Sequence, residues 1–430
     1  MSTFLNVIRA DGQTEQRQIA DMKARAAETA ADIDRKVAAI MEDVRKNGME
    51  AVERYSVQFD KNKPYIVSPE RIQQAYDACP KELRDALEQS AANIADYHEK
   101  MMVKTWEYDR APGAKLGQVV RGLARVGIYV PGGTAAYPST VLMNAVTAKV
   151  AGVGQIIMVT PPTENLSDVV LTAAKIAGVD QVIACGGVQA IAALTYGAGF
   201  IPAVDKIVGP GNAFVAAAKK QAFGKVDIDM IAGPSEVLVI ADESADPVYV
   251  AADLLSQAEH DRMASAVLLT DSEELALRVS EEMDCQSADM PRRDIIEESV
   301  KNYGIGLVFD NLEDACAMAD EVAPEHLEVV TAQPRDLLPH LHNAGAIFLG
   351  AYSPEPLGDY MAGPCHVLPT SGTARFFSPL STDTFLKKTS VIEYSQDELL
   401  KVADGIIAMA ESEKLTAHAN SVRKRKETRA

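Results

Sequence analysis

From Arg125 onward, short apolar runs alternate with longer segments in which apolar residues recur at helical spacing. Such runs are typical of buried strands, and the longer segments are typical of helices that pack on them. The predicted strands cover residues 126–130, 156–160, 181–184 and 206–208, and the predicted helices cover 140–151, 166–177, 188–195 and 213–223. This alternation predicts a parallel sheet flanked by helices.

Three of the turns after these strands are rich in glycine, namely 131–133, 186–187 and 209–212. Right-handed crossovers would place them at one edge of the sheet, where ligands of open α/β sheets bind. The turn 209–212 follows a strand and opens a helix, as a dinucleotide-binding turn does. It lacks the third glycine, and no clear acidic residue ends a second strand at the usual distance. An ordinary βα turn and a variant dinucleotide site therefore both remain open.

A similar alternation starts again after a boundary near residues 232–235. Its predicted strands are 236–240, 266–270, 306–309, 327–330 and 346–349, and its clearest helices are 246–260 and 312–322. The fold class we predict is therefore α/β with two parallel-sheet units. Residues 350–380 are rich in Gly, Pro, Ser and Thr, and we expect them to form a long loop that carries functional groups.

The two ends of the chain follow a largely helical pattern. Helical spacing covers 23–47 and 81–100, and Ser68 followed by Pro69 predicts the start of another helix between them. His98 falls in a charged helical segment, where we expect a solvated surface residue. Residues 1–22 are polar and ambiguous, and residues 381–430 are predicted to be mainly helical.

Composition narrows the class of protein. The 42 basic and 61 acidic residues give a net charge of −19, which argues against binding nucleic acid. The five cysteines are widely spaced and odd in number, so neither a disulfide framework nor a C-x-x-C zinc motif is indicated. We find no signal peptide and no apolar stretch near the roughly 20 residues that span a bilayer. We expect a soluble cytoplasmic protein without a membrane partner.

Candidate chemistry begins with Gln257 and His260 at the end of a predicted helix. Positions i and i+3 share one helical face, so an amide oxygen and an imidazole nitrogen would lie side by side. Two donors make a poor metal site, but Asp359 in the long loop and His418 in the C-terminal region would add an oxygen and a nitrogen. This donor set suits zinc or another divalent transition ion. A structural role for each residue is the alternative.

At this point the sequence resembles the histidinol dehydrogenase family. The resemblance rests on motifs in the family's order between residues 127 and 418, each of them modest alone. They are Gly127-Ile-Tyr-Val-Pro-Gly-Gly133, Gly209-Pro-Gly-Asn212, Ala232-Gly-Pro-Ser-Glu236, the stretch from Asp253 to His260, Pro324-Glu-His326, Gly358-Asp-Tyr360, His366-Val-Leu-Pro-Thr-Ser-Gly372 and Leu415-Thr-Ala-His418. The family oxidises L-histidinol through an aldehyde to L-histidine with two NAD⁺, in the last steps of histidine synthesis.

The resemblance implies a role for each matching residue. Glu325 and His326 correspond to the catalytic pair. Zinc ligands are implied at Gln257, His260, Asp359 and His418; NAD contacts at Tyr129, Gln189 and Asn212; and substrate contacts at Ser235 and Glu413, together with the four metal residues and His326. His326 can take a hydroxyl proton near neutral pH, and Glu325 can deprotonate the water that hydrates the aldehyde. Zinc would mainly orient the substrate's nitrogens.

The resemblance also implies an architecture and a partner. We expect two incomplete Rossmann-like parallel-sheet domains with small helical terminal segments. Residues 23–129 with 236–380 would form a first α/β domain that carries most of the site, and 130–235 a second, NAD-binding one, between the terminal segments 1–22 and 381–430. The family is a homodimer in which the C-terminal segment reaches the partner's active site, so His418 and Glu413 would serve the other subunit.

Three other functions remain open. A sister dehydrogenase with NAD and zinc could act on another polar alcohol, such as a sulfonated diol, but an anionic sulfonate would need a nearby Arg or Lys that the sequence does not locate. A zinc hydrolase would use Glu325 to activate water but would leave the glycine turns without a ligand. A non-catalytic nucleotide-binding regulator would not need Glu325 and His326.

One residue departs from the family pattern. The family commonly has Asn before His366, and this chain has Cys365. A thiol facing the site would make an enzyme sensitive to oxidation, whereas a buried thiol would serve packing. We expect the packing role.

Overall fold

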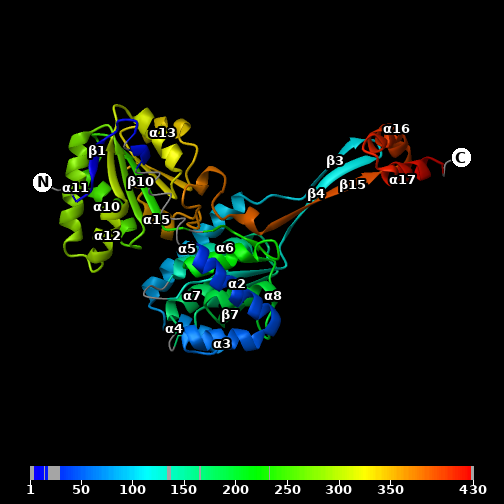
Figure 1. Cartoon of the computed structure of the whole chain (residues 1–430), viewed down its shortest axis with the longest axis horizontal. Helices are drawn as coiled ribbons and strands as arrows, with labels where there is room; N and C mark the ends of the chain where they lie inside the picture. Colours follow the sequence, from blue (N-terminus) through cyan, green and yellow to red (C-terminus); the bar gives the residue numbers. More distant parts are fainter. Residues whose placement is uncertain are drawn as a thin grey trace. The chain divides into compact units, whose positions relative to one another are not determined.

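A computed structural model describes residues 4–13, 15–17, 30–132, 137–163, 166–231 and 233–427. The chain separates into two compact units. The first consists of Met1–Met101 and Leu123–Phe385, and the second of Met102–Gly122 and Leu386–Ala430. Figure 1 labels their helices and strands. In the described part, no helix is both long enough and apolar enough to cross a membrane.

The first unit contains two sheets, one of which is built mainly from the glycine-turn region. Its strand order is β2-β7-β6-β5-β8-β9. All neighbouring pairs are parallel except β2 with β7. The strands are β2 (Tyr65–Ile66), β5 (Arg125–Tyr129), β6 (Gln155–Thr160), β7 (Gln181–Ala184), β8 (Lys206–Val208) and β9 (Asp227–Ile228).

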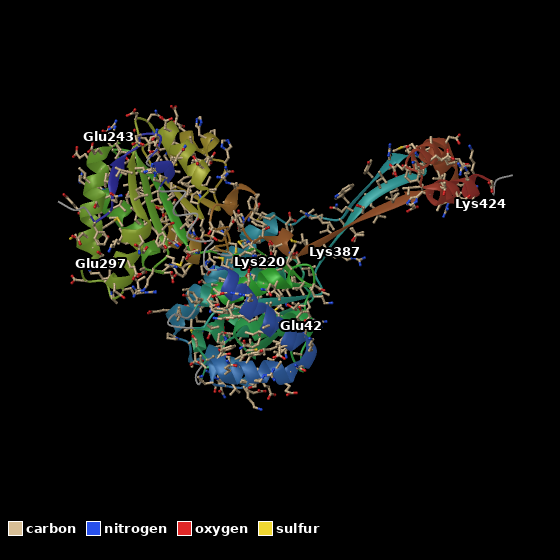
Figure 2. All side chains as sticks on the ribbon, in the orientation of Figure 1. Glu42, Lys220, Glu243, Glu297, Lys387 and Lys424 are labelled. Carbon is tan, nitrogen blue, oxygen red and sulfur yellow. The ribbon has the colours of Figure 1, made fainter. Side chains whose placement is uncertain are left out.

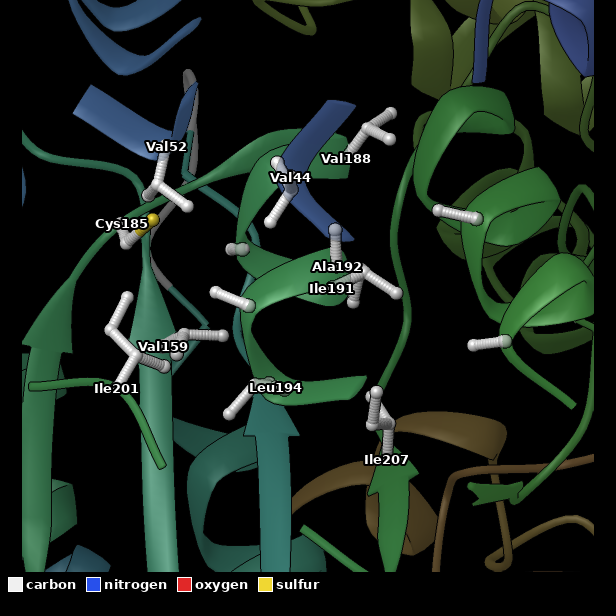
Figure 3. Packing of buried hydrophobic residues seen from close by; sticks show 14 of the residues in the cluster. Val44, Val52, Val159, Cys185, Val188, Ile191, Ala192, Leu194, Ile201 and Ile207 are labelled. Atoms are coloured by element: carbon white, nitrogen blue, oxygen red, sulfur yellow. The ribbon is translucent and has the colours of Figure 1, made fainter. Parts of the chain in front are cut away.

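Helices that flank this sheet come from both sides of the predicted domain boundary. They are α2 (Ala30–Asn47), α3 (Met49–Asp60), α4 (Pro69–Ala78), α5 (Lys81–Lys100), α6 (Pro138–Val150), α7 (Asp168–Ile176), α8 (Gly187–Tyr196) and α9 (Ala213–Ala222). Apolar side chains of α2, α3 and α8 share one core with the sheet, where Figure 3 shows Val44, Ile191, Leu194 and Ile207 packed together. This core packs α2 and α3 against the glycine-turn region.

The other sheet has the order β1-β12-β11-β10-β13-β14, and every pair in it is parallel. Its strands are β1 (Val7–Arg9), β10 (Glu236–Ala241), β11 (Ser265–Thr270), β12 (Gly304–Val308), β13 (His326–Val330) and β14 (Ala346–Leu349). The helices around it are α10 (Pro247–Ala258), α11 (Glu273–Ser287), α12 (Arg293–Tyr303), α13 (Leu312–Val322), α14 (Pro334–Leu337) and α15 (Glu355–Tyr360). Short 3₁₀ turns lie at Leu338–His340, Thr373–Arg375 and Thr382–Phe385.

Two separate apolar cores stabilise this second sheet. One joins α10, α11 and α12 to the strands, and the other joins α13 to them.

Charged side chains lie on the surface of the first unit, and Figure 2 labels the exposed Lys220, Glu243 and Glu297 among them. The parallel α/β architecture predicted from the sequence is confirmed.

The second unit is an antiparallel sheet with two helices. The sheet order is β15-β4-β3, with β3 (Trp106–Ala111), β4 (Ala114–Gly122) and β15 (Leu386–Tyr394). The helices are α16 (Gln396–Ser412) and α17 (Thr416–Glu427). The helical prediction for residues 381–430 was therefore incomplete, because β15 is a strand.

Other expectations also need correction. The helix predicted over 23–47 begins at Ala30 within the described residues, and residues 18–29 lie outside them. The helix predicted over 246–260 ends at Ala258, so His260 stands in the turn that follows. His98 is fully buried, because the face of α5 that carries it also buries Leu87 and Ile94.

Candidate active site

The centre of the site is His326, the first residue of β13, which lies between β10 and β14. Nδ1 of its ring lies 3.1 Å from the Glu236 carbonyl oxygen. A carbonyl oxygen only accepts, so Nδ1 carries the proton and Nε2 is the basic nitrogen of the neutral ring. Nε2 is buried and has no hydrogen-bond partner among the described residues. Nε2 is therefore the ring nitrogen that is available to accept a proton.

Burial also sets the charge of this histidine. Loss of water lowers the pKa of His326 to about 4, although the nearby Asp359 carboxylate opposes the shift. The ring is therefore neutral at physiological pH, as a general base must be.

Glu325 stands immediately before the strand, and its Oε2 lies 3.7 Å from Nδ1 of His326. The same oxygen accepts a hydrogen bond of 3.0 Å from the backbone N–H of Glu236. Burial raises the pKa of Glu325 well above its ordinary value. A carboxylate with a raised pKa is a stronger base than an exposed one, which suits proton transfer to and from water.

Asp359 of α15 offers a carboxylate oxygen within 4.8 Å of a ring nitrogen of His326. Its Oδ1 is 3.4 Å from Nδ1 of His366. Burial alone would raise the pKa of Asp359, but the neighbouring His366 imidazole holds it below its usual value. Asp359 is therefore a carboxylate at neutral pH, the form that binds a cation.

Glu355 is a site residue that the sequence did not point to. His326, Glu355 and Asp359 each offer a ligand atom, and these atoms lie within 4.8 Å of one another. Oε1 of Glu355 is 3.8 Å from Nε2 of His326. Glu355 opens the short helix α15 after Pro354, a position with no local signature of chemistry.

Glu355 belongs to a cluster of carboxyl groups with the buried Glu328 and the partly buried Asp253. Glu328 Oε1 accepts a hydrogen bond of 2.7 Å from the Glu355 backbone N–H. Burial, followed by the charge of Asp253, raises the pKa of Glu328 to about 9. Burial likewise raises the pKa of Asp253 to about 6 and that of Glu355 to about 9. At neutral pH Glu328 and Glu355 are therefore protonated, and the ionised Asp359 is the group beside His326 that attracts a cation.

Gln257 meets a specific requirement of a metal ligand. The side chain is 0% exposed, and neither its amide oxygen nor its amide nitrogen has a partner among the described residues. An unpaired buried amide costs free energy unless a ligand satisfies it. Ser256, the preceding residue, donates to Glu355 Oε2 at 3.5 Å, so this end of α10 adjoins α15.

The other predicted ligands are placed less closely. His260 is exposed, and its backbone N–H donates to the Gln257 carbonyl at 3.1 Å. Its imidazole is among the groups that lower the pKa of His326. His418 and Glu413 belong to the second unit, where both are exposed near the turn between α16 and α17. The structure therefore brings Asp359 and His326 together and leaves the roles of His418 and Glu413 as predictions.

Ser235 directly precedes β10 and is partly buried. Two hydrogen bonds connect the segment around it, residues 233–236, to the loop 366–372. The Gly233 N–H donates to Thr370 Oγ1 at 2.6 Å, and the Ser371 N–H donates to Glu236 Oε2 at 3.2 Å. Ala232 of the same motif lies outside the described residues.

Cys365, at the start of that loop, is buried rather than directed into solvent. Its Sγ accepts from the Val367 N–H at 3.4 Å, and burial raises the pKa of the thiol to about 12. A thiol in this state is unreactive, so its position suits packing.

The three residues predicted to contact NAD lie at the carboxyl ends of strands in the glycine-turn sheet or in the turns that follow. Tyr129 ends β5, and its hydroxyl accepts from the Gly187 N–H at 3.2 Å. Gln189 is buried in the first turn of α8 with its Oε1 unpartnered. Asn212 caps α9 through hydrogen bonds from the N–H groups of Phe214 and Val215. An unpartnered buried oxygen at such an edge fits a ligand with hydrogen-bond donors.

A buried ion pair fixes the shape of the turn 209–212. Lys219 Nζ lies 2.5 Å from Asp229 and also donates to the Gly209 carbonyl at 2.8 Å. Asp229 in turn accepts from the Gly209 N–H at 2.8 Å. Gly209 has φ +104°, and a Cβ there would lie 2.2 Å from the Tyr129 carbonyl oxygen, so only glycine fits. Sequence reasoning missed this pair.

Comparison with known proteins identifies the family. The sequence model of the histidinol dehydrogenase family matches residues 23–426. The chain belongs to the histidinol dehydrogenase family. It is 54% identical over 398 residues to the histidinol dehydrogenase of Heliobacterium mobile, covering 91% of this chain and 93% of that protein. It is 49% identical over 429 residues to that of Clostridium acetobutylicum, covering 99% of this chain and 100% of that protein.

A solved structure agrees with this assignment. The crystal structure of histidinol dehydrogenase from Elizabethkingia anophelis superposes with a TM-score of 0.93 at 34% identity, covering 100% of this chain and 99% of that one. Family membership makes the chain an oxidoreductase, and the similarity extends over both of its units.

Proposed function

We propose that the protein oxidises L-histidinol to L-histidine through L-histidinaldehyde, as the final steps of histidine biosynthesis, with NAD⁺ as oxidant and one zinc ion per subunit. The observation that carries this proposal is the arrangement of His326, whose Nδ1 is tied to the main chain while Nε2 is free, beside Glu325. Family membership supplies the substrate, and the geometry supplies the bases that both oxidation steps need.

The chain's own groups can handle every proton. In the first oxidation Nε2 of His326 takes the hydroxyl proton of the alcohol. Glu325 then removes a proton from the water that adds to the aldehyde carbon. His326 releases its first proton to solvent and then takes the hydroxyl proton of the resulting hydrate as the second oxidation proceeds. One histidinol and one water thus give one carboxylate, and four electrons leave as two hydrides.

When bound, NAD⁺ would supply the hydride acceptor and zinc would help to orient the substrate. Gln257, Asp359 and His260 would hold the zinc, and the unpaired amide of Gln257 with the ionised Asp359 fits that role. NAD would be held by Gln189 and Asn212 of the predicted NAD-binding domain, residues 130–235, and by Tyr129 at the end of the strand just before it. Ser235 would contact the substrate.

The charge of the site also selects among substrates. Asp359 lies beside His326 and stays ionised, and this charge favours a cationic amino alcohol. A sulfonated diol would bring a negative charge beside the Asp359 carboxylate, which disfavours the sister-dehydrogenase alternative. We propose further that the chain forms a homodimer, with His418 completing the zinc site and Glu413 the substrate site of a second copy.

Stoichiometry tests the proposal. Purified protein with L-histidinol and excess NAD⁺ should form two NADH and one histidine for each histidinol consumed. Formation of one NADH would end the four-electron mechanism. Formation of none, with zinc supplied, would end the proposed function.

A further inference from the structure

The glycine-turn sheet has the strand order of a dinucleotide-binding half, yet it lacks the usual acidic residue. From β5 the chain adds β6 and then β7 on one side, and it adds the next strand, β8, on the other side of β5. Ligands of such sheets bind at this change of side, between β5 and β8. In the usual arrangement an acidic residue at the end of the second strand hydrogen-bonds the ribose hydroxyls of NAD. Here the second strand, β6, ends in Thr160 and is followed by Pro161 and Pro162.

A carboxylate reaches this place from another part of the chain. Asp60 is the last residue of α3 and precedes every strand of the glycine-turn sheet in the sequence. Asn62, two residues later, donates a hydrogen bond of 3.3 Å to the Pro162 carbonyl. This contact attaches the end of α3 to the segment that leaves β6, so Asp60 lies at the carboxyl edge of the sheet.

Asp60 also contacts the residues proposed to bind NAD. Its Oδ2 accepts a hydrogen bond of 3.0 Å from Nε2 of Gln189, whose own Oε1 has no partner in the described part of the chain. Its charge acts on the hydroxyl of Tyr129 and on the thiol of Cys185. The carboxylate therefore adjoins two of the three predicted cofactor contacts, and it is partly exposed, so a ligand can reach it.

We propose that Asp60 is the residue that selects NAD over NADP, by accepting hydrogen bonds from the ribose hydroxyls of the adenosine half. This inference rests on the proposed function, because it needs NAD to bind at this edge. A carboxylate has several acceptor positions, and the hydrogen bond from Gln189 leaves others for hydroxyl donors. The same carboxylate would repel the 2′-phosphate of NADP.

The surrounding charges do not provide a phosphate site while Asp60 is ionised. Lys63 forms an ion pair of 2.7 Å with Glu53, and Lys61 Nζ donates to the Gln58 carbonyl at 2.8 Å. Both lysines are near Asp60 in sequence. Neutralising Asp60 would therefore remove a repulsion, which should improve NADP binding as well as weaken NAD binding.

Calorimetric titration of the purified zinc-loaded protein with NAD⁺ and with NADP⁺ tests this without relying on turnover. Asp60→Asn keeps an acceptor for Gln189 and removes the charge, and Asp60→Ala removes both. In each variant the preference for NAD⁺, expressed as the ratio of the two dissociation constants, should fall by about tenfold or more, the size expected for hydrogen bonds to a charged group. The matched control is Glu50→Gln, an exposed position at the other end of the same helix, which should leave the ratio unchanged.

The outcomes separate the two levels of the hypothesis. An unchanged ratio in correctly folded Asp60→Asn and Asp60→Ala proteins, with wild-type NAD⁺ binding intact, overturns the role of Asp60 alone. Absence of NAD⁺ binding by the wild-type protein overturns the proposed function and this inference together. A fall in the ratio for Glu50→Gln equal to that for Asp60→Asn would assign the effect to general surface charge and reject a specific contact.

Discussion

Nδ1 of His326 and the carbonyl oxygen of Glu236 lie 3.1 Å apart, so one main-chain atom of β10 determines the tautomer of the proposed general base. Side-chain carboxylates often play this part in other enzymes and can be mutated away. Here the acceptor is part of the sheet itself, within the parallel pair β10 and β13. The orientation of the base is therefore as rigid as the sheet.

Replacing Glu325 by Gln should separate the two oxidation steps. Gln keeps an oxygen that can accept from the Glu236 N–H, so the geometry is retained, but it cannot deprotonate water. We expect aldehyde oxidation to fall by about 10²- to 10⁴-fold and the NADH yield to drop from two towards one per histidinol. Rapid-quench analysis of NADH and aldehyde measures this. The exposed Glu313→Gln is the control, and a wild-type yield at the wild-type rate in Glu325→Gln would contradict the role.

The buried carboxyl groups predict how the stability of the metal-free protein depends on pH. The folded-state pKa values of Glu328 and Glu355, about 9, lie above the unfolded value of 4.5, so the folded state binds more protons. Their stabilisation is complete below the unfolded pKa and is lost as pH rises towards 9. His326 acts in the opposite sense, because its pKa falls from 6.5 to about 4 and stability is lost as pH drops through that window.

Glu328→Gln isolates the carboxyl contribution, since an amide needs no proton to be neutral. Between pH 5 and pH 9 the free energy of unfolding of the metal-free wild-type protein should fall by a few kcal/mol, and the variant should show a flatter dependence. Chemical denaturation with chelator present at pH 5, 7 and 9 measures it. Equal slopes for the two proteins would show that Glu328 titrates as an exposed acid does, and the exposed Glu313→Gln should follow the wild type.

The buried amide of Gln257 predicts metal content directly. Gln257→Ala should lose zinc, with an affinity reduced by about 10-fold or more, because one ligand is removed while Asp359 and His260 remain. Metal analysis of protein dialysed against a weak chelator checks this, and activity should fall in parallel. Gln74→Ala, an exposed position on α4, should retain zinc like the wild type. Full zinc occupancy in Gln257→Ala would remove Gln257 from the ligand set.

The parts of the fold that were predictable are those in which burial follows chain periodicity. Strands β6, β7 and β11 are buried along nearly their whole length, so each appears in the sequence as an apolar run. Strand β3 is almost wholly exposed, with Trp106 and Tyr108 on its surface, and it carries no such pattern. Strand β15 is mostly exposed as well and was taken for helix.

The site divides in a similar way. Residues with recognisable motifs, such as His326 and Asp359, could be proposed from the sequence, although only the resemblance assigned them roles. The carboxyl cluster combines residues from three elements, with Glu355 on α15, Glu328 on β13 and Asp253 on α10. No local sequence pattern indicates that these three residues lie close together. Asp60 was missed for the same reason, because it reaches the strand ends from a preceding helix. The sequence pattern predicts single elements, but it does not predict which side chains from distant elements come together in space.

The proposed exchange of C-terminal segments between subunits predicts complementation. His418 and His326 would belong to the same site only in a dimer, so His418→Ala and His326→Ala proteins should each be nearly inactive. A heterodimer of the two contains one site built from intact His326 and intact His418. Unfolding and refolding an equimolar mixture forms about half heterodimer, so activity should recover to about a quarter of the wild-type value per chain. Differently tagged chains confirm the mixing, and refolding each variant alone is the control. If both residues served one site within a single chain, confirmed heterodimers would stay inactive.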